Sequence, residues 1–267
     1  MPHPGRPEAG PRERLDKADW ARLAAPNRQW PCLMRPWSPI PIVDNGEPLE
    51  PLPAWLQRIE PHPYQALGAP YGSSGCPFRL RRGVIERLAR ASATLSSAAP
   101  GWRLAVFDAW RPIPVQRFMV AYAIGEECRA RGLDPGAGGP ALQDVEEAVG
   151  RFWAPPNEDP AMPPPHSTGA AVDLTLADAS GTLLSMGGAI DAIGAVSEPD
   201  HHAAAAQHDP HGEPARWHGR RLLLRRVMAA AGFVQHPNEW WHFSHGDQLW
   251  AWRSGCSKAM YGRSDVS

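Results

Sequence analysis

Apolar residues recur at helical spacing in three stretches of the chain. The first, residues 82–95, predicts an amphipathic helix with one buried face. Residues 115–131 and 215–231 predict two more helices, and the glycine after each, Gly132 and Gly232, is typical of a helix C-terminus. The residues that we expect to face inward on the third helix are Leu222, Leu223, Val227 and Ala230.

Three shorter segments have the composition of buried strands. Residues 104–107 and 170–176 are almost entirely apolar, and residues 240–243 are rich in aromatic side chains, which favour strands. The predicted helices and strands do not alternate regularly, as they would around a parallel sheet. The pattern therefore predicts a single domain of the α+β class.

The organisation along the chain follows from the distribution of proline, arginine and glycine. Residues 1–60 are rich in proline and arginine and predict an irregular N-terminal extension. We expect the domain itself to span residues 61–255, followed by a C-terminal tail at 256–267. Within the domain, residues 134–165 predict a long surface excursion around a short helical stretch near 145–153, and residues 198–213 predict a loop.

Composition excludes several classes of function. The hydrophobic content is 43% with 12 tryptophans, which indicates a folded core, and the net charge of −1 offers nucleic acid no basic surface. The four cysteines form no CxxC pair, so a thiolate metal site is not indicated. The N-terminus lacks a secretory apolar run, and no segment reaches the ~18 apolar residues of a membrane span. We therefore expect a cytoplasmic protein without a membrane partner; the oligomeric state stays open.

Candidate metal ligands stand in one segment, His166-Ser-Thr-Gly-Ala-Ala-Val-Asp173. Imidazole and carboxylate groups bind zinc well, and the small residues between them allow a tight turn that brings both side chains together. The alternative is a loop histidine and an aspartate that caps a turn. The segment alone favours that alternative.

A second segment, Glu239-Trp-Trp-His242, carries a carboxylate and an imidazole three positions apart. On one continuous strand these side chains would point to opposite faces. They share a site only if Glu239 lies in a turn, which Pro237-Asn238 makes plausible, and His242 begins the strand. The alternative is an aromatic core strand with a surface glutamate.

A third segment, Asp108-Ala-Trp-Arg-Pro112, follows the predicted strand at 104–107. A guanidinium at a strand end can bind a developing oxyanion or a carboxylate. The alternative is a local ion pair between Arg111 and Asp108.

Taken together, the three segments resemble the D-alanyl-D-alanine dipeptidases, the VanX-type enzymes of the zinc D,D-peptidase family. The family signature is Ser-x-His-x-x-Gly-x-Ala-x-Asp, a later Glu-x-x-His and an upstream Asp-x-x-Arg-Pro. The resemblance covers roughly residues 64–250. The matching residues are His166, Gly169, Ala171, Asp173, Glu239, His242, Asp108, Arg111 and Pro112.

The resemblance implies a D,D-peptidase/hedgehog-like fold, with a small antiparallel sheet flanked by helices, and one Zn²⁺ per chain. It implies a metallopeptidase with a small dipeptide as substrate. The implied roles are zinc ligation by His166, Asp173 and His242, general base catalysis by Glu239, oxyanion stabilisation by Arg111, and substrate binding by Asp191, Asp108 and Tyr64.

The chain departs from the family pattern immediately before the first metal ligand. The family serine two residues before that histidine is Pro164 here, and Pro165 follows it. The loop has therefore lost hydroxyl groups and gained rigidity, which leaves the dipeptide preference open. Two other functions also stay open: a zinc D,D- or L,D-carboxypeptidase acting on peptidoglycan peptides, and a binding module that keeps the fold without turnover.

Overall fold

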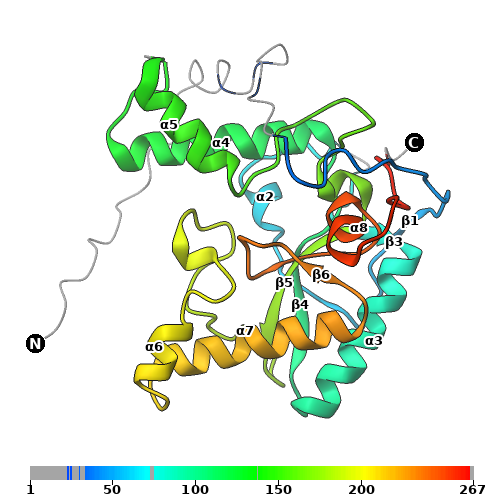
Figure 1. The fold of residues 1–267 in the computed structure, drawn as a ribbon. Coiled ribbons are helices and arrows are strands. Elements are labelled where there is room, and N and C mark those ends of the chain that lie inside the picture. The colour runs from blue at the N-terminus through cyan, green and yellow to red at the C-terminus, as the bar shows by residue number, and fades with distance from the viewer. Residues whose placement is uncertain are drawn as a thin grey trace, which may run out of the picture.

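The computed structural model describes Leu23, Ala25, Trp30 and residues 34–72, 75–136 and 138–264. Most of residues 1–33 of the predicted extension, and the last three residues of the predicted tail, lie outside this part. The helices are α2 (Pro63–Ala66), α3 (Arg82–Ala98), α4 (Ile113–Arg131), α5 (Gly139–Gly150), α6 (Ala203–His208), α7 (Glu213–Ala230) and α8 (Gln248–Ser254) (Figure 1). The strands are β1 (Leu49–Pro51), β2 (Gln57–Arg58), β3 (Arg79–Arg81), β4 (Arg103–Asp108), β5 (Ala171–Ala177), β6 (Val234–Gln235) and β7 (His242–Ser244).

One five-stranded sheet lies at the centre, with the strand order β2-β4-β5-β7-β6. The pairs from β4 to β6 are antiparallel, and β2 joins β4 in parallel at the edge. A separate two-stranded sheet is formed by β1 and β3. Helices surround the central sheet without βα alternation, so the α+β class predicted from the sequence is confirmed.

Helices α3 and α7 pack against each other and against one face of the central sheet. Strand β5 turns Val172, Leu174 and Leu176 towards these helices, where they join one hydrophobic cluster with residues of α3 and α7. Because strand residues alternate between faces, Asp173 points to the opposite face. That face carries the polar residues described below.

A second hydrophobic cluster fills the space between α4, α5 and the α2 region, and it includes Tyr64 and Trp153. In Figure 1 these helices stand apart from α3 and α7, on the other side of the sheet. Gly132 ends α4 with a left-handed φ of 65°, as its place after the predicted helix indicated. The polar face of the sheet therefore lies between two separate apolar clusters.

Two predictions about the second half of the chain are wrong. Residues 198–213 include the short helix α6, where we expected only a loop. On α7 the predicted inward face is only partly correct: Val227 is buried and Leu223 packs against the core, but Leu222 is 43% exposed, and Arg221, Leu224 and Met228 are buried instead. Arg221 takes an inward position that hydropathy alone does not predict, because its guanidinium donates to the carbonyl oxygens of Met186, Val196 and Glu198.

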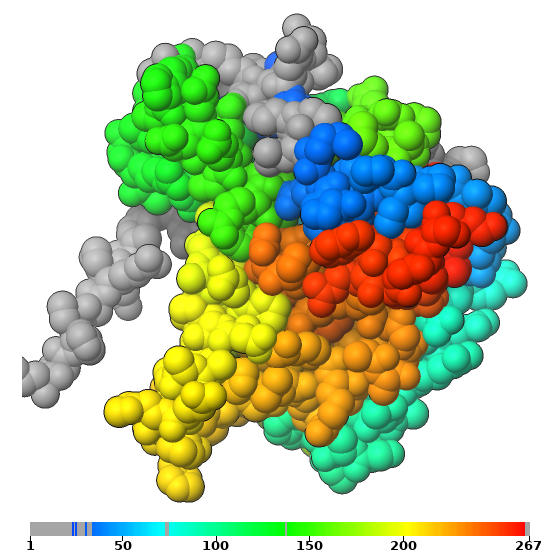
Figure 2. Space-filling model, viewed as in Figure 1, coloured from blue at the N-terminus to red at the C-terminus, as the bar shows by residue number. Residues whose placement is uncertain are grey.

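The described part of the N-terminal region lies along the C-terminal segment. Figure 2 shows the blue residues from 34 onward beside the red C-terminal residues. Ile42 forms a parallel bridge with Ala259, and Ser38 and Ile40 accept hydrogen bonds from the Gln248 side chain. Residues 34–58 thus contribute two strands and a packed turn to the folded structure.

Candidate active site

The sheet itself places two of the predicted metal ligands side by side. Strands β5 and β7 are antiparallel, and their register sets Asp173 directly opposite His242. Directly opposed side chains on one sheet face are close enough to interact. The Asp173 Oδ1 atom lies 3.1 Å from His242 Nδ1. Strand β7 begins at His242, and its register places this histidine on the same face as Asp173. This meets the condition stated above for Glu239 and His242 to share a site.

His166 reaches the same place from a tight turn between Pro165 and Thr168. Gly169 ends the turn with φ of 70°, the left-handed conformation that favours glycine. The His166 Nδ1 atom lies 2.7 Å from the carbonyl oxygen of Ala109. A carbonyl oxygen only accepts, so Nδ1 carries the proton and Nε2 presents its lone pair to the site.

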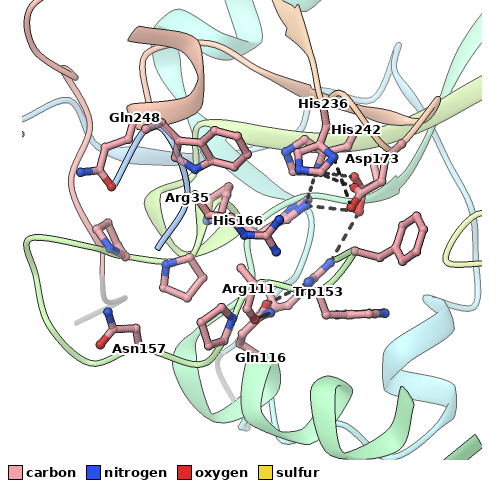
Figure 3. Close-up of a pocket in the computed structure, with 18 of the residues that line it drawn as sticks. Arg35, Arg111, Gln116, Trp153, Asn157, His166, Asp173, His236, His242 and Gln248 are labelled. Atoms are coloured by element: carbon pink, nitrogen blue, oxygen red, sulfur yellow. Dashed lines mark hydrogen bonds and ion pairs between the residues drawn. The ribbon is translucent and has the colours of Figure 1, made fainter. Parts of the chain in front are cut away.

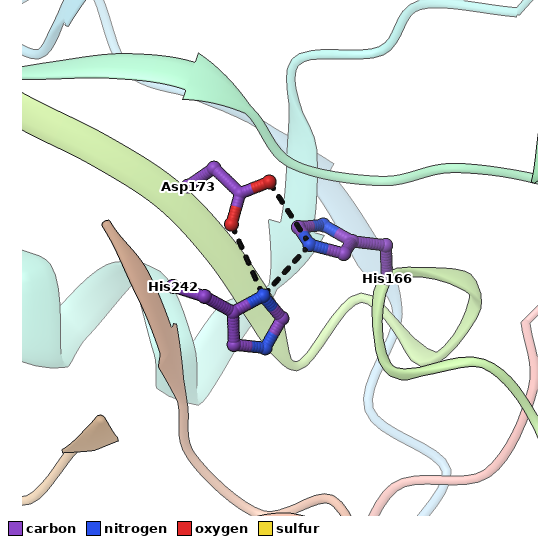
Figure 4. Close-up of side chains that lie close together, drawn as sticks. All are labelled: His166, Asp173 and His242. Atoms are coloured by element: carbon purple, nitrogen blue, oxygen red, sulfur yellow. Dashed lines mark hydrogen bonds and ion pairs between the residues drawn. The ribbon is translucent and has the colours of Figure 1, made fainter. Parts of the chain in front are cut away.

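The three predicted ligands have the geometry of a metal centre (Figure 4). His166 Nε2 lies 3.2 Å from His242 Nδ1 and 3.2 Å from Asp173 Oδ2. A tetrahedral zinc ion with bonds of about 2.0–2.1 Å keeps its ligand atoms roughly 3.3 Å apart. The buried Asp173 Oδ1 has no hydrogen-bond partner. The donor set and the unpartnered oxygen both fit a divalent cation.

Electrostatics keep the carboxylate of this group ionised. Burial acts to raise the pKa of Asp173, but His166 and His242 outweigh it and hold the pKa well below the ordinary value. Asp173 is therefore present as the anion that a metal ligand must be.

Glu239 lies in the turn before β7 and is 5% exposed. Its Oε2 atom lies 3.6 Å from His242 Nδ1, and its Oε1 atom, 3.5 Å from His236 Nδ1, has no hydrogen-bond partner. Burial, together with the negative charges of Asp173 and Asp191, raises the pKa of Glu239 well above its ordinary value. A buried carboxyl with a raised pKa beside candidate metal ligands has the properties of a general base.

Asp108 and Arg111 are fixed together at the end of β4. The register of β4 against β5 shifts between Val106 and Asp108, and this irregularity turns Asp108 towards the polar face. The Arg111 Nε and one terminal nitrogen donate to Asp108 Oδ2, at 3.0 and 2.7 Å. Burial favours the neutral carboxyl, but Arg111, His62 and His166 lower the pKa of Asp108 to about 2.

Further hydrogen bonds leave Arg111 little freedom. It donates to Gln116 Oε1 at 2.9 Å and to the Tyr64 hydroxyl at 3.2 Å. These bonds and the two to Asp108 use four of its five N–H groups, so one is left without a partner among the described residues. The guanidinium also lies 5.0 Å from the ring centroids of Tyr64 and Trp153. Arg111 is thus held rigidly, with one donor to spare.

Asp191 enters the site from the loop between β5 and α6. It is the only described residue other than glycine with a positive φ, 65°, which is the strained left-handed region. The Tyr64 hydroxyl donates to its Oδ2 atom at 2.8 Å. Burial, followed by the charge of Asp173, raises the pKa of Asp191 to about 7.

One pocket connects these residues (Figure 3). Six of the eight predicted site residues line it directly, while Asp108 and Tyr64 stand behind it and bond to Arg111. Sequence reasoning missed other lining residues, and the ones labelled in Figure 3 are Arg35, Gln116, Trp153, Asn157, His236 and Gln248. His236 precedes Glu239 by three positions, but His236 alone formed no motif.

Comparison with known proteins agrees with this geometry. The model of the Peptidase_M15 family, described as D-ala-D-ala dipeptidase, matches residues 57–259. The chain belongs to this family. The resemblance inferred from the sequence is confirmed, and membership makes the chain an enzyme of a metallopeptidase class.

Relatives within the family cover much of the chain. A D-alanyl-D-alanine dipeptidase of Synechocystis sp. is 43% identical over 227 residues, which are 82% of this chain and 90% of that protein. A D-alanyl-D-alanine dipeptidase of Enterococcus faecalis is 27% identical over 162 residues, 60% of this chain and 71% of that protein. Among solved structures, a mutant of the vancomycin resistance D,D-pentapeptidase VanY in complex with Zn(II) is 16% identical, with a TM-score of 0.43, over 83% of this chain and 97% of that one.

Within the described part of this family member, no helix combines the length and apolar character needed to cross a bilayer.

Proposed function

We propose that this chain is a zinc-dependent dipeptidase that hydrolyses D-alanyl-D-alanine or a similar D,D-dipeptide. The observation that carries the proposal is the convergence of His166, Asp173 and His242 at mutual distances of 3.1–3.2 Å. Three protein ligands leave one coordination position open, which is typical of catalytic rather than structural zinc sites. The Synechocystis relative, named as a D-alanyl-D-alanine dipeptidase, supports the choice of substrate.

The roles of the side chains follow from their positions. When held by the three ligands, zinc supplies a Lewis acid and lowers the pKa of a neighbouring water towards ~7. Glu239 takes a proton from the attacking water and delivers it to the leaving amine. Arg111 donates its uncommitted N–H to the oxygen of the scissile carbonyl as negative charge develops there. Because four hydrogen bonds already orient this guanidinium, little reorganisation is needed during the reaction.

Substrate binding falls to Asp191, which lines the pocket, with Tyr64 and Asp108 supporting the site from behind. We assign the substrate ammonium group to Asp191, because three carboxylates line the pocket and the other two, Asp173 and Glu239, already serve as metal ligand and general base. Tyr64 holds Asp191 through its hydroxyl, and Asp108 holds Arg111. A bound ammonium group favours the carboxylate form of Asp191 and so opposes the raised pKa of the free site.

A dipeptide panel with and without chelator tests the proposal. Amine release is measured with D,D-, L,D- and L,L-dipeptides and with a longer peptidoglycan peptide, and zinc content is measured by elemental analysis. We expect hydrolysis of the D,D-dipeptide, its loss on chelation and its recovery when zinc is returned.

The variant His166→Ala should lose both zinc and activity, because two ligands bind the ion far more weakly than three. The variant His211→Ala, which changes an exposed histidine, is the matched control and should keep both. Hydrolysis that survives complete metal depletion, or a preference for the longer peptide, would contradict the proposal.

A further inference from the structure

Arg35 reaches the active-site pocket from the N-terminal segment (Figure 3). It stands outside residues 57–259, the part of the chain that the family model matches. Of the described arginines and lysines, only Arg35 and Arg111 line this pocket. The pocket therefore contains one charged residue contributed by sequence outside the family's shared segment.

The backbone around Arg35 is a packed turn. The Arg35 amide donates to Ser38 Oγ at 3.0 Å, and the Ser38 amide donates to the Arg35 carbonyl at 2.9 Å. Trp37 is 8% exposed, and its ring packs against those of Trp252 and His236 at centroid distances of 5.5 and 5.8 Å. These contacts fix the backbone from which the Arg35 side chain extends.

The Arg35 guanidinium has hydrogen-bonding capacity that the described residues do not use. It donates to the carbonyl oxygens of Gly150 and Arg151 at the end of α5. A guanidinium has five N–H donors, so three remain. No described carboxylate lies within ion-pair distance of it, whereas Arg111 is paired with Asp108. Arg35 is thus the lining arginine without a carboxylate partner among the described residues, and it has more free donors than Arg111.

Several other lining residues of the pocket provide few competing donors. Pro163, Pro164 and Pro165 line it, and proline has neither an N–H nor a hydroxyl group. The amide groups of Gln116 and Gln248 already donate to backbone carbonyl oxygens. A free dipeptide carries a carboxylate at one end, and burying it without a partner costs free energy. The pocket therefore needs a cation for that end.

We propose that Arg35 binds the C-terminal carboxylate of the substrate and so selects free dipeptides over peptides that continue beyond this end. The inference rests on the proposed function. It assigns the two ends of the substrate to opposite charges, the ammonium group to Asp191 and the carboxylate to Arg35. An Arg–carboxylate pair is short, directional and charge-assisted, which suits it to this selection.

Comparing a free dipeptide with its amide tests this role. The substrates are D-alanyl-D-alanine and its C-terminal carboxamide, and kcat and KM are measured for wild type, Arg35→Ala and Arg35→Lys. We expect Arg35→Ala to lower kcat/KM for the free acid roughly 10- to 150-fold, mainly through KM, because a charge-assisted hydrogen bond is lost. The value for the carboxamide should change little, and Arg35→Lys should recover part of the loss.

The matched control is Arg151→Ala, which removes an exposed arginine next to the carbonyl oxygens that Arg35 contacts. It should leave both substrates unaffected. Retained carboxamide hydrolysis by Arg35→Ala shows that the variant is folded. The positive charge of Arg35 also acts to lower the pKa of Glu239, and losing that effect would slow both substrates alike. An equal loss for both substrates would therefore overturn the assignment. Wild-type turnover that does not distinguish acid from amide would also overturn it.

A binding measurement separates this inference from the proposed function. Calorimetric titration of both compounds into Glu239→Gln, with and without Arg35→Ala, reads recognition in the absence of turnover. Tighter binding of the free acid that depends on Arg35 supports the inference even if wild type hydrolyses no D,D-dipeptide, a result that would overturn the proposed function alone. Equal affinity for acid and amide, or binding of neither, overturns the carboxylate role.

Discussion

The two faces of the central sheet are built from the same strands but differ in chemistry. Towards α3 and α7, β5 presents Val172, Leu174 and Leu176, each fully buried in an apolar cluster. Towards the pocket it presents Asp173, and β7 presents His242 directly opposite. The first face has the composition of a stabilising core. The second buries carboxylates and imidazoles that an apolar core would exclude, so we expect its residues to matter for catalysis more than for stability.

The largest effect should come from the polar face. Glu239→Gln keeps the size of the side chain but cannot take a proton, so kcat should fall about 10²- to 10⁴-fold. Zinc content should stay at the wild-type level, and the melting temperature should not drop, because a buried carboxyl group with a raised pKa has been removed. Amine release, elemental analysis and thermal unfolding measure the three quantities.

Glu86→Gln makes the same chemical change at an exposed position on α3 and should behave as wild type. Near-normal turnover by Glu239→Gln would remove this residue from its proposed role.

A smaller effect, on stability alone, should come from the apolar face. Leu174→Ala removes a fully buried side chain and should lower the free energy of unfolding by about 2–5 kcal/mol. Urea unfolding gives that value, and zinc binding by the folded variant should be retained. The control is Leu222→Ala, which changes a side chain that is 43% exposed and should cost less than about 0.5 kcal/mol. Equal costs at the two positions would contradict the orientation of the sheet and α7.

The smallest effect should be a pH-dependent change in stability caused by Asp191 on the polar face. The pKa of Asp191 in the folded, metal-free protein is raised to about 7, so the folded state holds this proton more tightly than the unfolded state. The stability that this group contributes is full below its ordinary pKa, near ~4, and is lost as the pH rises through about 7. Asparagine does not titrate. The melting temperature of Asp191→Asn relative to wild type, both with chelator, should therefore increase by a few degrees between about pH 5 and pH 8.

Asp144→Asn provides the comparison for that series, since Asp144 is exposed on α5. A pH-independent difference for Asp191→Asn would show that the carboxyl group at this position titrates normally.

The sequence predicted those elements whose side chains follow one local period. The helix at 82–95 and the strand at 104–107 lie within α3 and β4, and the strand at 170–176 overlaps β5 in all but its first residue. Their apolar residues repeat every 3.6 or 2 positions, or form one buried run. The pattern failed on α7 because Arg221 occupies a buried position. Hydropathy places arginine outside, but here three carbonyl oxygens and the Trp240 ring, 5.1 Å away, surround it.

Motif spacing predicted the central site residues but not the residues that contact them or complete the pocket. His166, Asp173 and His242 stand in recognisable segments, and the structure places their ligand atoms within 4.8 Å of one another. His62 and Tyr71, which contact Asp108, and Arg35, which lines the pocket, come from segments with no motif. Their positions depend on tertiary contacts between residues far apart in the chain, such as the 208 positions that separate Ile40 from Gln248.

The Gln248 side chain has a consequence for how the chain must be assembled. Its amide nitrogen shares its protons among the carbonyl oxygens of Ser38, Ile40 and Ala161, so a single group on α8 ties the N-terminal turn to the proline-rich loop that leads to His166. The junction between these two parts of the pocket lining therefore depends on α8. A chain without α8 would keep His166, Asp173 and His242 but would lose the side chain that holds the two segments together.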